Sequence, residues 1–161
     1  MNTKRPFFIL SLIVTTIVLD TISKLYFSGI LHGKTIPLIS DFITLYLVHN
    51  TGVAFSLPIR GVFLQILTVL LLAFIIFYFI RFEYRKNARL LDIGYALILW
   101  GALSHAYERI VYGKVIDFIA VKYFAVLNFA DIFISIGVLL LFLYYLFYER
   151  HHWKHITSTR K

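Results

Sequence analysis

Two aspartates in the second half of the chain have surroundings suited to hydrolytic chemistry. Asp117 is a lone carboxylate within the apolar pentad Val-Ile-Asp-Phe-Ile, and a buried carboxylate needs a partner or a function. Asp131 precedes a long apolar run. Two carboxylates that lie close together in a partly dry site do not both ionise readily, so one of them keeps a proton. Such a pair can activate water with one carboxylate and protonate a leaving amine with the other.

Several of the polar residues also have simpler interpretations. A carboxylate at the amino terminus of a helix stabilises that helix, so the position of Asp131 leaves a capping role and a catalytic role both open. Asp20 and Lys24 are spaced i,i+4, which is typical of a helix-face ion pair and favours a structural role for them. Arg109 either contributes to a site or extends its side chain to lipid headgroups.

The sequence gives little support for metal or thiol chemistry. The absence of cysteine excludes a thiol nucleophile, a thiolate metal site and disulfides. His105 and Glu108 are spaced i,i+3 and could share a metal, but two ligands without a clear third favour packing or hydrogen bonding. A metal site built on these two residues is therefore only weakly indicated.

The composition indicates that these residues lie in a membrane protein. Sixty per cent of the 161 residues are apolar and 15% are charged, whereas soluble domains have roughly 45–50% and 25%. A soluble chain of this length could not bury so much apolar surface. The formal net charge of +8 comes from basic blocks that border apolar runs, as the positive-inside rule requires, so we expect no nucleic-acid partner.

Four apolar runs predict an all-α integral membrane protein with a single domain over residues 1–161. The expected transmembrane helices span about 6–26, 62–80, 90–108 and 131–148. The runs show no period-2 alternation, which favours helices over barrel strands. The first run is long enough to span and lacks a small-x-small cleavage site, so we interpret it as a retained helix rather than a signal peptide.

The distribution of Lys and Arg predicts the orientation. The amino terminus, the loop around 81–89 and the carboxyl tail are rich in Lys and Arg, while the two longer connections are poor in them. Both termini should therefore be cytoplasmic and both long connections outside. The β-branched and aromatic residues of the first connection predict a small β-rich element over about 36–57, lying at the outer interface.

This topology brings polar residues from distant parts of the sequence to one level of the membrane. Asp20 and Lys24 fall in the last turns of the first helix, and Asn50 lies in the first outer connection. The remaining members of this group are His105, Glu108 and Arg109 at the end of the third helix, Asp117 and Asn128 in the second outer connection, and Asp131 at the start of the fourth helix. We expect these residues to form a site at the outer face.

Five motifs in this order resemble those of the lipoprotein signal peptidases, also called signal peptidase II. They are Asp20-Thr-Ile-Ser-Lys24, Asn50-Thr-Gly-Val-Ala-Phe55, Gly101-Ala-Leu-Ser-His-Ala-Tyr-Glu-Arg109, Gly113-Lys-Val-Ile-Asp-Phe-Ile119 and Asn128-Phe-Ala-Asp131. The resemblance covers nearly the whole chain. It implies a membrane aspartyl endopeptidase that removes signal peptides from diacylglyceryl-modified bacterial prolipoproteins, located in the inner membrane with its active site at the outer face.

The resemblance also implies roles for individual residues. Asp117 and Asp131 correspond to the catalytic pair, and the other matching positions, which would bind substrate or support the site, are Asn50, Arg109, Asn128, Asp20 and Lys24. The expected partners are prolipoproteins and membrane lipids, and we expect a monomer. No metal or cofactor is implied.

One motif departs from the family pattern, which usually reads Gly-Asn-x-x-Asp-Arg. His105 stands in place of the asparagine and Glu108 in place of the aspartate. The changes leave room for an alternative, a non-catalytic or altered-specificity relative that binds lipidated peptides. A transporter is disfavoured because the ionisable residues gather at one end of the helices, and a metal hydrolase built on His105 and Glu108 ranks lower still.

Overall fold

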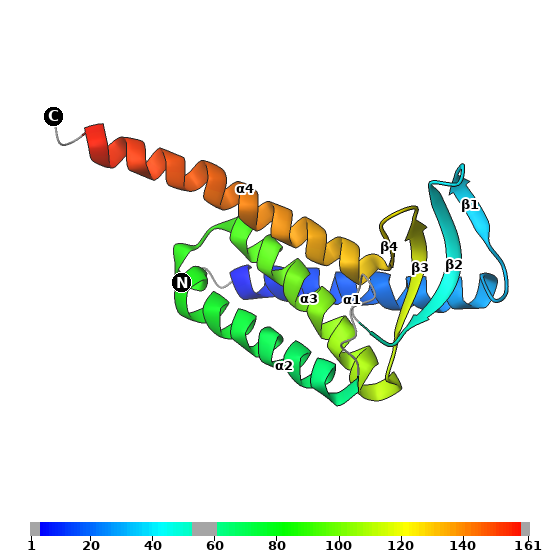
Figure 1. Cartoon of the computed structure of the whole chain (residues 1–161). Coiled ribbons are helices and arrows are strands. Elements are labelled where there is room, and N and C mark those ends of the chain that lie inside the picture. Colours follow the sequence, from blue (N-terminus) through cyan, green and yellow to red (C-terminus); the bar gives the residue numbers. More distant parts are fainter. Residues whose placement is uncertain (1–3, 53–60, 159–161) are drawn as a thin grey trace.

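The computed structural model describes residues 4–52 and 61–158, with side chains described as far as residue 147. Within these residues a bundle of helices carries a small sheet at one end (Figure 1). The long helices are α1 (Lys4–Ile30), α2 (Gly61–Tyr78), α3 (Arg89–Tyr112) and α4 (Phe129–Ser158). α1 and α3 run towards the sheet while α2 and α4 run away from it, so the bundle has a sheet end and an opposite end.

The outside of the bundle is apolar. Each of the four helical segments is long and apolar enough to cross a membrane, which confirms the predicted four-helix organisation for the described part of the chain. Large apolar side chains face outwards along it: Phe7, Leu25 and Val62 are 74%, 71% and 68% exposed. Lipid, unlike water, is a good solvent for such a surface.

α3 lies at the centre of the bundle and contacts α1, α2 and α4. In its most apolar window 67% of the residues are buried, against 17% or less in the other three spans. α3 also carries buried polar side chains, namely Asp92, Ser104, His105 and Glu108. Polar groups within a membrane span are stable where neighbouring helices supply partners, and the central helix offers the most neighbours.

α3 and α4 pack closely at the sheet end because one glycine removes a side chain there. A Cβ atom on Gly101 would lie 2.6 Å from the carbonyl oxygen of Ala130, closer than real Cβ atoms approach. Gly101 precedes His105 by about one helical turn, and Ala130 directly precedes Asp131. This contact therefore sets the separation of two predicted site residues.

The sheet is antiparallel and has the order β1-β2-β3-β4. Its strands are β1 (Ile36–Ile39), β2 (Ile43–Asn50), β3 (Val115–Val121) and β4 (Ala125–Leu127). β1 and β2 fall within the segment expected to be β-rich, as the β-branched and aromatic residues there favour. The end of that segment, residues 53–57, lies outside the described residues.

β3 and β4 lie in the second connection, outside the segment that was predicted to be β-rich. The second connection supplies half of the sheet, because β3 pairs with β2 and places Asp117 opposite Val48. Phe118 is fully buried and stacks on Phe27 of α1, with ring centroids 4.4 Å apart. Since successive side chains of a strand point to opposite faces, this packing turns Asp117 away from α1.

The opposite end of the bundle is closed by ion pairs. α2 continues into a π-helical segment, Phe79–Glu83, and a short 3₁₀ turn, Tyr84–Lys86, so the helical structure extends six residues past the predicted helix end at residue 80. The Arg5 guanidinium donates to both carboxylate oxygens of Asp92, at 2.7 and 2.6 Å. The ammonium of Lys86 lies 3.0 Å from Glu83 Oε1. The Arg5–Asp92 pair thus connects the ends of α1 and α3 far from the sheet, while Lys86 neutralises Glu83 within one helical segment.

Candidate active site

Asp117 lies on β3 and is 2% exposed. Each of its carboxylate oxygens accepts one side-chain amide hydrogen bond: Asn50 Nδ2 donates to Oδ2 at 3.0 Å and Asn128 Nδ2 donates to Oδ1 at 2.7 Å. Asn50 comes from β2 and Asn128 from the turn before α4. The carboxylate is therefore held between two neutral amides rather than beside a cation in hydrogen-bond contact.

The orientations of both amides are fixed by the backbone. Asn50 Oδ1 accepts the N–H of Gly52 at 3.0 Å, and Asn128 Oδ1 accepts the N–H of Asp131 at 3.2 Å. Because each amide oxygen is committed to a backbone donor, each amide nitrogen must face the other way, towards Asp117. The asparagines thus hold the carboxylate in a defined position.

Asp131 both caps α4 and faces the site. Its Oδ2 accepts the backbone N–H of Asn128 at 2.9 Å, and Asn128 Oδ1 in turn accepts the backbone N–H of Asp131. These two reciprocal bonds are the arrangement of a capping box. Its other oxygen, Oδ1, lies 3.3 Å from His105 Nε2. The capping role that the sequence left open is present, and it uses only one of the two carboxylate oxygens.

Asn128 links the two aspartates, since its side chain bonds Asp117 while its backbone N–H bonds Asp131. Burial raises the pKa of Asp117 above the ordinary value for aspartate, and the negative charge of Asp131 acts in the same direction. The hydrogen bonds from Asn50 and Asn128 act against this rise in pKa. A carboxyl group in these surroundings is suited to hold a proton that the site can use.

Arg109 adds positive charge beside the pair. Its guanidinium donates to the carbonyl oxygen of Gly52 at 3.2 Å, so the side chain turns towards the end of β2. Its charge acts on both Asp117 and Asp131. Its own carbonyl oxygen accepts a bond from Gln65 Nε2 at 2.7 Å, which ties α2 to this end of α3. Gln65 is the most polar residue of α2.

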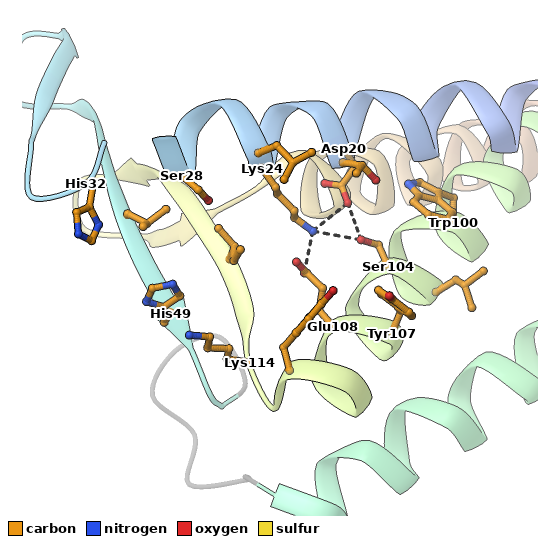
Figure 2. A pocket seen from close by; sticks show the side chains of 16 residues that line it. Asp20, Lys24, Ser28, His32, His49, Trp100, Ser104, Tyr107, Glu108 and Lys114 are labelled. Atoms are coloured by element: carbon orange, nitrogen blue, oxygen red, sulfur yellow. Dashed lines mark hydrogen bonds and ion pairs between the residues drawn. The ribbon is translucent and has the colours of Figure 1, made fainter. Parts of the chain in front are cut away.

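Asp20, Lys24 and Glu108 form a second cluster together with Ser104, as Figure 2 shows. The Lys24 ammonium lies 2.9 Å from Asp20 Oδ2 and 2.8 Å from Glu108 Oε2, and it also donates to Ser104 Oγ at 3.1 Å. The Ser104 hydroxyl donates to Asp20 Oδ2 at 2.5 Å. This arrangement is the ion pair that the i,i+4 spacing favours, extended across to α3. The sequence analysis missed Ser104.

α3 separates the two groups by using two neighbouring rows of side chains. Ser104 and Glu108, four residues apart, face Lys24 of α1. The next row, His105 and Arg109, faces Asp131 and the end of β2. These four residues, Asp20, Lys24, Ser104 and Glu108, are called the Lys24 cluster. The cluster makes no direct contact with Asp117 or Asp131, although the charge of Lys24 does act on Asp131.

The Lys24 cluster borders a cavity of about 800 Å³. Ile116 and His49, a pair across β3 and β2, also line this cavity. The neighbouring residues in the two strands, Asp117 and Asn50, bond each other instead. The cavity and the aspartate pair thus lie on different faces of the sheet.

The two residues considered as metal ligands have different partners. Glu108 contacts Lys24, whereas His105 contacts Asp131. Within residues 4–52 and 61–147, no group of three or more His, Cys, Asp and Glu side chains is arranged to hold a metal ion. This geometry gives no support to a metal site shared by His105 and Glu108.

The chain is similar to known bacterial membrane proteases over most of its length. The model of the family described as signal peptidase (SPase) II matches residues 12–147. The lipoprotein signal peptidase of Clostridium novyi is 34% identical, with 84% of this chain and 95% of that protein covered. The lipoprotein signal peptidase of Bartonella henselae is 36% identical, with 83% and 85% covered. A solved bacterial membrane enzyme has the same fold, with a TM-score of 0.75, 24% identity and coverage of 86% and 87%.

Proposed function

This chain belongs to the signal peptidase II family of aspartic peptidases, and we propose that Asp117 and Asp131 are the carboxylates with which it removes signal peptides from lipoprotein precursors. The observation that carries the proposal is the shared contact with Asn128, which bonds one carboxylate through its side chain and the other through its backbone. Two carboxylates held by one residue form a unit that can share a proton.

The pair hydrolyses a peptide bond without a covalent intermediate. One carboxylate takes a proton from water while the water oxygen forms a bond to the carbonyl carbon of the scissile peptide. The other carboxyl group gives its proton to the nitrogen of the leaving amine as the C–N bond breaks. The two groups have then exchanged protonation states and must exchange a proton with water before the next turnover.

The remaining polar residues support this reaction. Asn50 and Asn128 position Asp117, and Arg109 attracts the negative charge that develops on the substrate carbonyl oxygen. Asp20, Lys24 and Glu108 hold α1 against α3 behind the site. No step of this scheme requires a metal ion or another cofactor.

The lipoprotein signal peptidases similar to this chain support the substrate, and the distribution of Lys and Arg in this multi-pass protein supports the orientation. Lys and Arg are frequent in the termini and in the loop around 81–89 but rare in the two longer connections. This difference supports cytoplasmic termini and a site at the outer face of the bacterial inner membrane. There the diacylglyceryl group of a prolipoprotein can stay in lipid while its scissile bond reaches the aspartates. The protein acts as a monomer among membrane lipids, since both carboxylates come from one chain.

His105 and Glu108 favour a second candidate. The family motif usually has asparagine and aspartate at these positions, and a change in both supports a relative that binds lipidated peptides without cutting them, or with altered specificity. Glu108 still pairs with Lys24 and His105 still faces Asp131, so the departures keep polar contacts. We therefore favour the peptidase.

Cleavage of a diacylglyceryl-modified prolipoprotein by the purified protein tests the proposal. Wild type should cut before the lipidated cysteine, and Asp117→Asn should not. Asp41→Asn, which changes an exposed aspartate in the turn between β1 and β2, is the matched control and should cut like wild type. Cleavage by Asp117→Asn would overturn the assignment, and binding without cleavage by wild type would favour the second candidate.

A further inference from the structure

The contact between His105 and Asp131 joins a titratable cation to one member of the aspartate pair. His105 Nε2 lies 3.3 Å from Asp131 Oδ1, and His105 is 8% exposed. A protonated imidazole at this distance forms an ion pair with a carboxylate, while a neutral imidazole offers only a hydrogen bond. The strength of the contact therefore depends on the proton of His105.

The fold holds both partners in place. The capping bond from the N–H of Asn128 occupies Asp131 Oδ2, which leaves Oδ1 for His105. The close approach of Gly101 to the Ala130 carbonyl brings this part of α3 against the start of α4. Neither residue needs to move for the contact to form.

Other charged groups surround this contact. They are Asp117 on β3, Glu108 and Arg109 on α3, and Lys24 on α1. α2, over Gly61–Tyr78, contains no Asp, Glu, Lys, Arg or His. Glu108 is bonded to Lys24 and Asp117 to two amides, so Asp131 is the carboxylate in contact with His105.

The two aspartates thus differ in their surroundings. Asp117 accepts hydrogen bonds from two neutral amides, whereas Asp131 accepts a backbone N–H and lies in contact with His105. We propose that His105 is a positioning residue that holds Asp131 as the charged member of the pair, which leaves Asp117 as the member that carries the proton. This inference rests on the proposed function, and it adds a division of roles and a dependence on pH.

The roles follow through one turnover. Ionised Asp131 takes a proton from water as the water oxygen bonds to the peptide carbonyl carbon, and Asp117 gives its proton to the amine nitrogen as the C–N bond breaks. His105 neither gains nor loses a proton in these steps. Its charge stabilises Asp131 before the reaction and thereby fixes which carboxylate acts as the base.

The kinetic test compares wild type with His105→Asn, because asparagine donates a hydrogen bond but cannot become charged. We expect the ratio of wild-type to variant kcat/KM to be about tenfold larger at about pH 5.5 than at about pH 8, on either side of the ordinary imidazole pKa of about 6.5. His49→Asn, on the other face of β2, is the matched control and should show a ratio near one at both pH values. A ratio for His105→Asn that does not change with pH would overturn the proposal.

Thermal unfolding tests the ion pair without relying on cleavage. His105→Asn should lower the melting temperature more at about pH 5.5 than at about pH 8, because only a charged imidazole forms an ion pair with the Asp131 carboxylate and acidic pH favours that charge. In an Asp131→Asn background this difference between pH values should disappear, as expected when the two residues interact directly. His105→Gln is a second neutral variant should the asparagine fold poorly.

The outcomes separate the two proposals. Absence of cleavage by wild type at every pH would reject the proposed function, while the melting comparison would still decide the ion pair. A pH-dependent melting effect that persists in Asp131→Asn would assign the partner of His105 to another group and overturn the inference. Loss of that effect, together with the tenfold kinetic change, would support it.

Discussion

Asp92 at the opposite end of the bundle and Asp117 at the sheet end are equally buried, at 2% exposed each, but their partners differ. Asp92 receives both hydrogen bonds from the Arg5 guanidinium, while Asp117 receives its bonds from the amides of Asn50 and Asn128. A carboxylate bonded to a guanidinium stays ionised, whereas one bonded to neutral amides can hold or release a proton. Burial alone therefore does not identify a reactive carboxylate, and the chemistry of the partner does.

The Lys24 cluster is an intermediate case. It lies near the sheet end, as the aspartate pair does, but its two carboxylates contact a cation, as the carboxylates at the opposite end do. Lys24 is 6% exposed, and Asp20 and Glu108 are 1% and 7% exposed. Because each carboxylate has a cation in contact, we assign this cluster to the fold rather than to the reaction.

The largest expected effect is the loss of turnover in Asp131→Asn. General acid–base groups contribute about 10²–10⁴-fold to rates, and kcat should fall by at least that factor. The side-chain oxygen of asparagine can still accept the N–H of Asn128, so α4 keeps its cap. The melting temperature should therefore change little at about pH 8, where the contact with His105 contributes least to stability. If Asp131→Asn melts like wild type and still cleaves substrate at the wild-type rate, the aspartates at the sheet end are not the reactive groups.

Asp92→Asn should produce the reverse pattern. It leaves Arg5, whose side chain is 12% exposed, without its carboxylate, so the protein should be destabilised, though by less than the loss of about 3–5 kcal/mol that follows when a fully buried pair is broken. Thermal unfolding should show the loss, while kcat of the folded protein, measured well below the new melting temperature, should stay near the wild-type value. A folded but inactive Asp92→Asn would mean that the opposite end contributes to the reaction.

Gly101→Ala should affect both properties to a smaller degree. The added methyl would lie 2.6 Å from the Ala130 carbonyl, and overpacking of this kind costs about 1–3 kcal/mol. Moving α3 away from α4 also separates His105 from Asp131, so kcat should fall with stability. Gly29→Ala is the control, because a Cβ there meets no atom within 4 Å. If Gly101→Ala and Gly29→Ala change kcat and the melting temperature equally, the close approach of α3 to α4 at Gly101 is not needed for activity or stability.

The smallest expected effect is a change in the pH dependence of stability in Asp117→Asn. Burial raises the pKa of Asp117 in the folded state, so ionisation of this group opposes folding. The opposition is absent below the ordinary aspartate pKa of about 3.9 and grows as pH rises through the higher folded value. The melting temperature of Asp117→Asn minus that of wild type should therefore be larger at neutral pH than near pH 4. A difference that shrinks as pH rises would contradict the cause assigned here.

The sequence predicted the features that depend on local composition. Long apolar runs predict helices because lipid requires every backbone polar group to be bonded within the segment. The order of polar residues at the helix ends also indicated which residues gather at the sheet end. Asp117 stood out because a lone carboxylate among apolar neighbours needs a partner.

The features that were missed depend on contacts between distant residues. β3 forms because Val48 and its neighbours pair with a segment about seventy residues away, and no local pattern encodes that register. Ser104 meets Lys24 and Gln65 meets the Arg109 carbonyl only after the helices pack. The sequence could not decide between a capping role and a role in the site for Asp131. Both roles are present, because the cap and the His105 contact use different oxygens of one carboxylate.

The most direct test of the account measures cleavage and melting together for Asp117→Asn and Asp92→Asn. Both substitutions remove a carboxylate that is 2% exposed, so burial is matched and only the partners differ. The account predicts that folded Asp117→Asn does not cleave the lipidated substrate, while Asp92→Asn melts earlier but cleaves at the wild-type rate when folded. Cleavage by Asp117→Asn, or a folded Asp92→Asn that does not cleave, would contradict it.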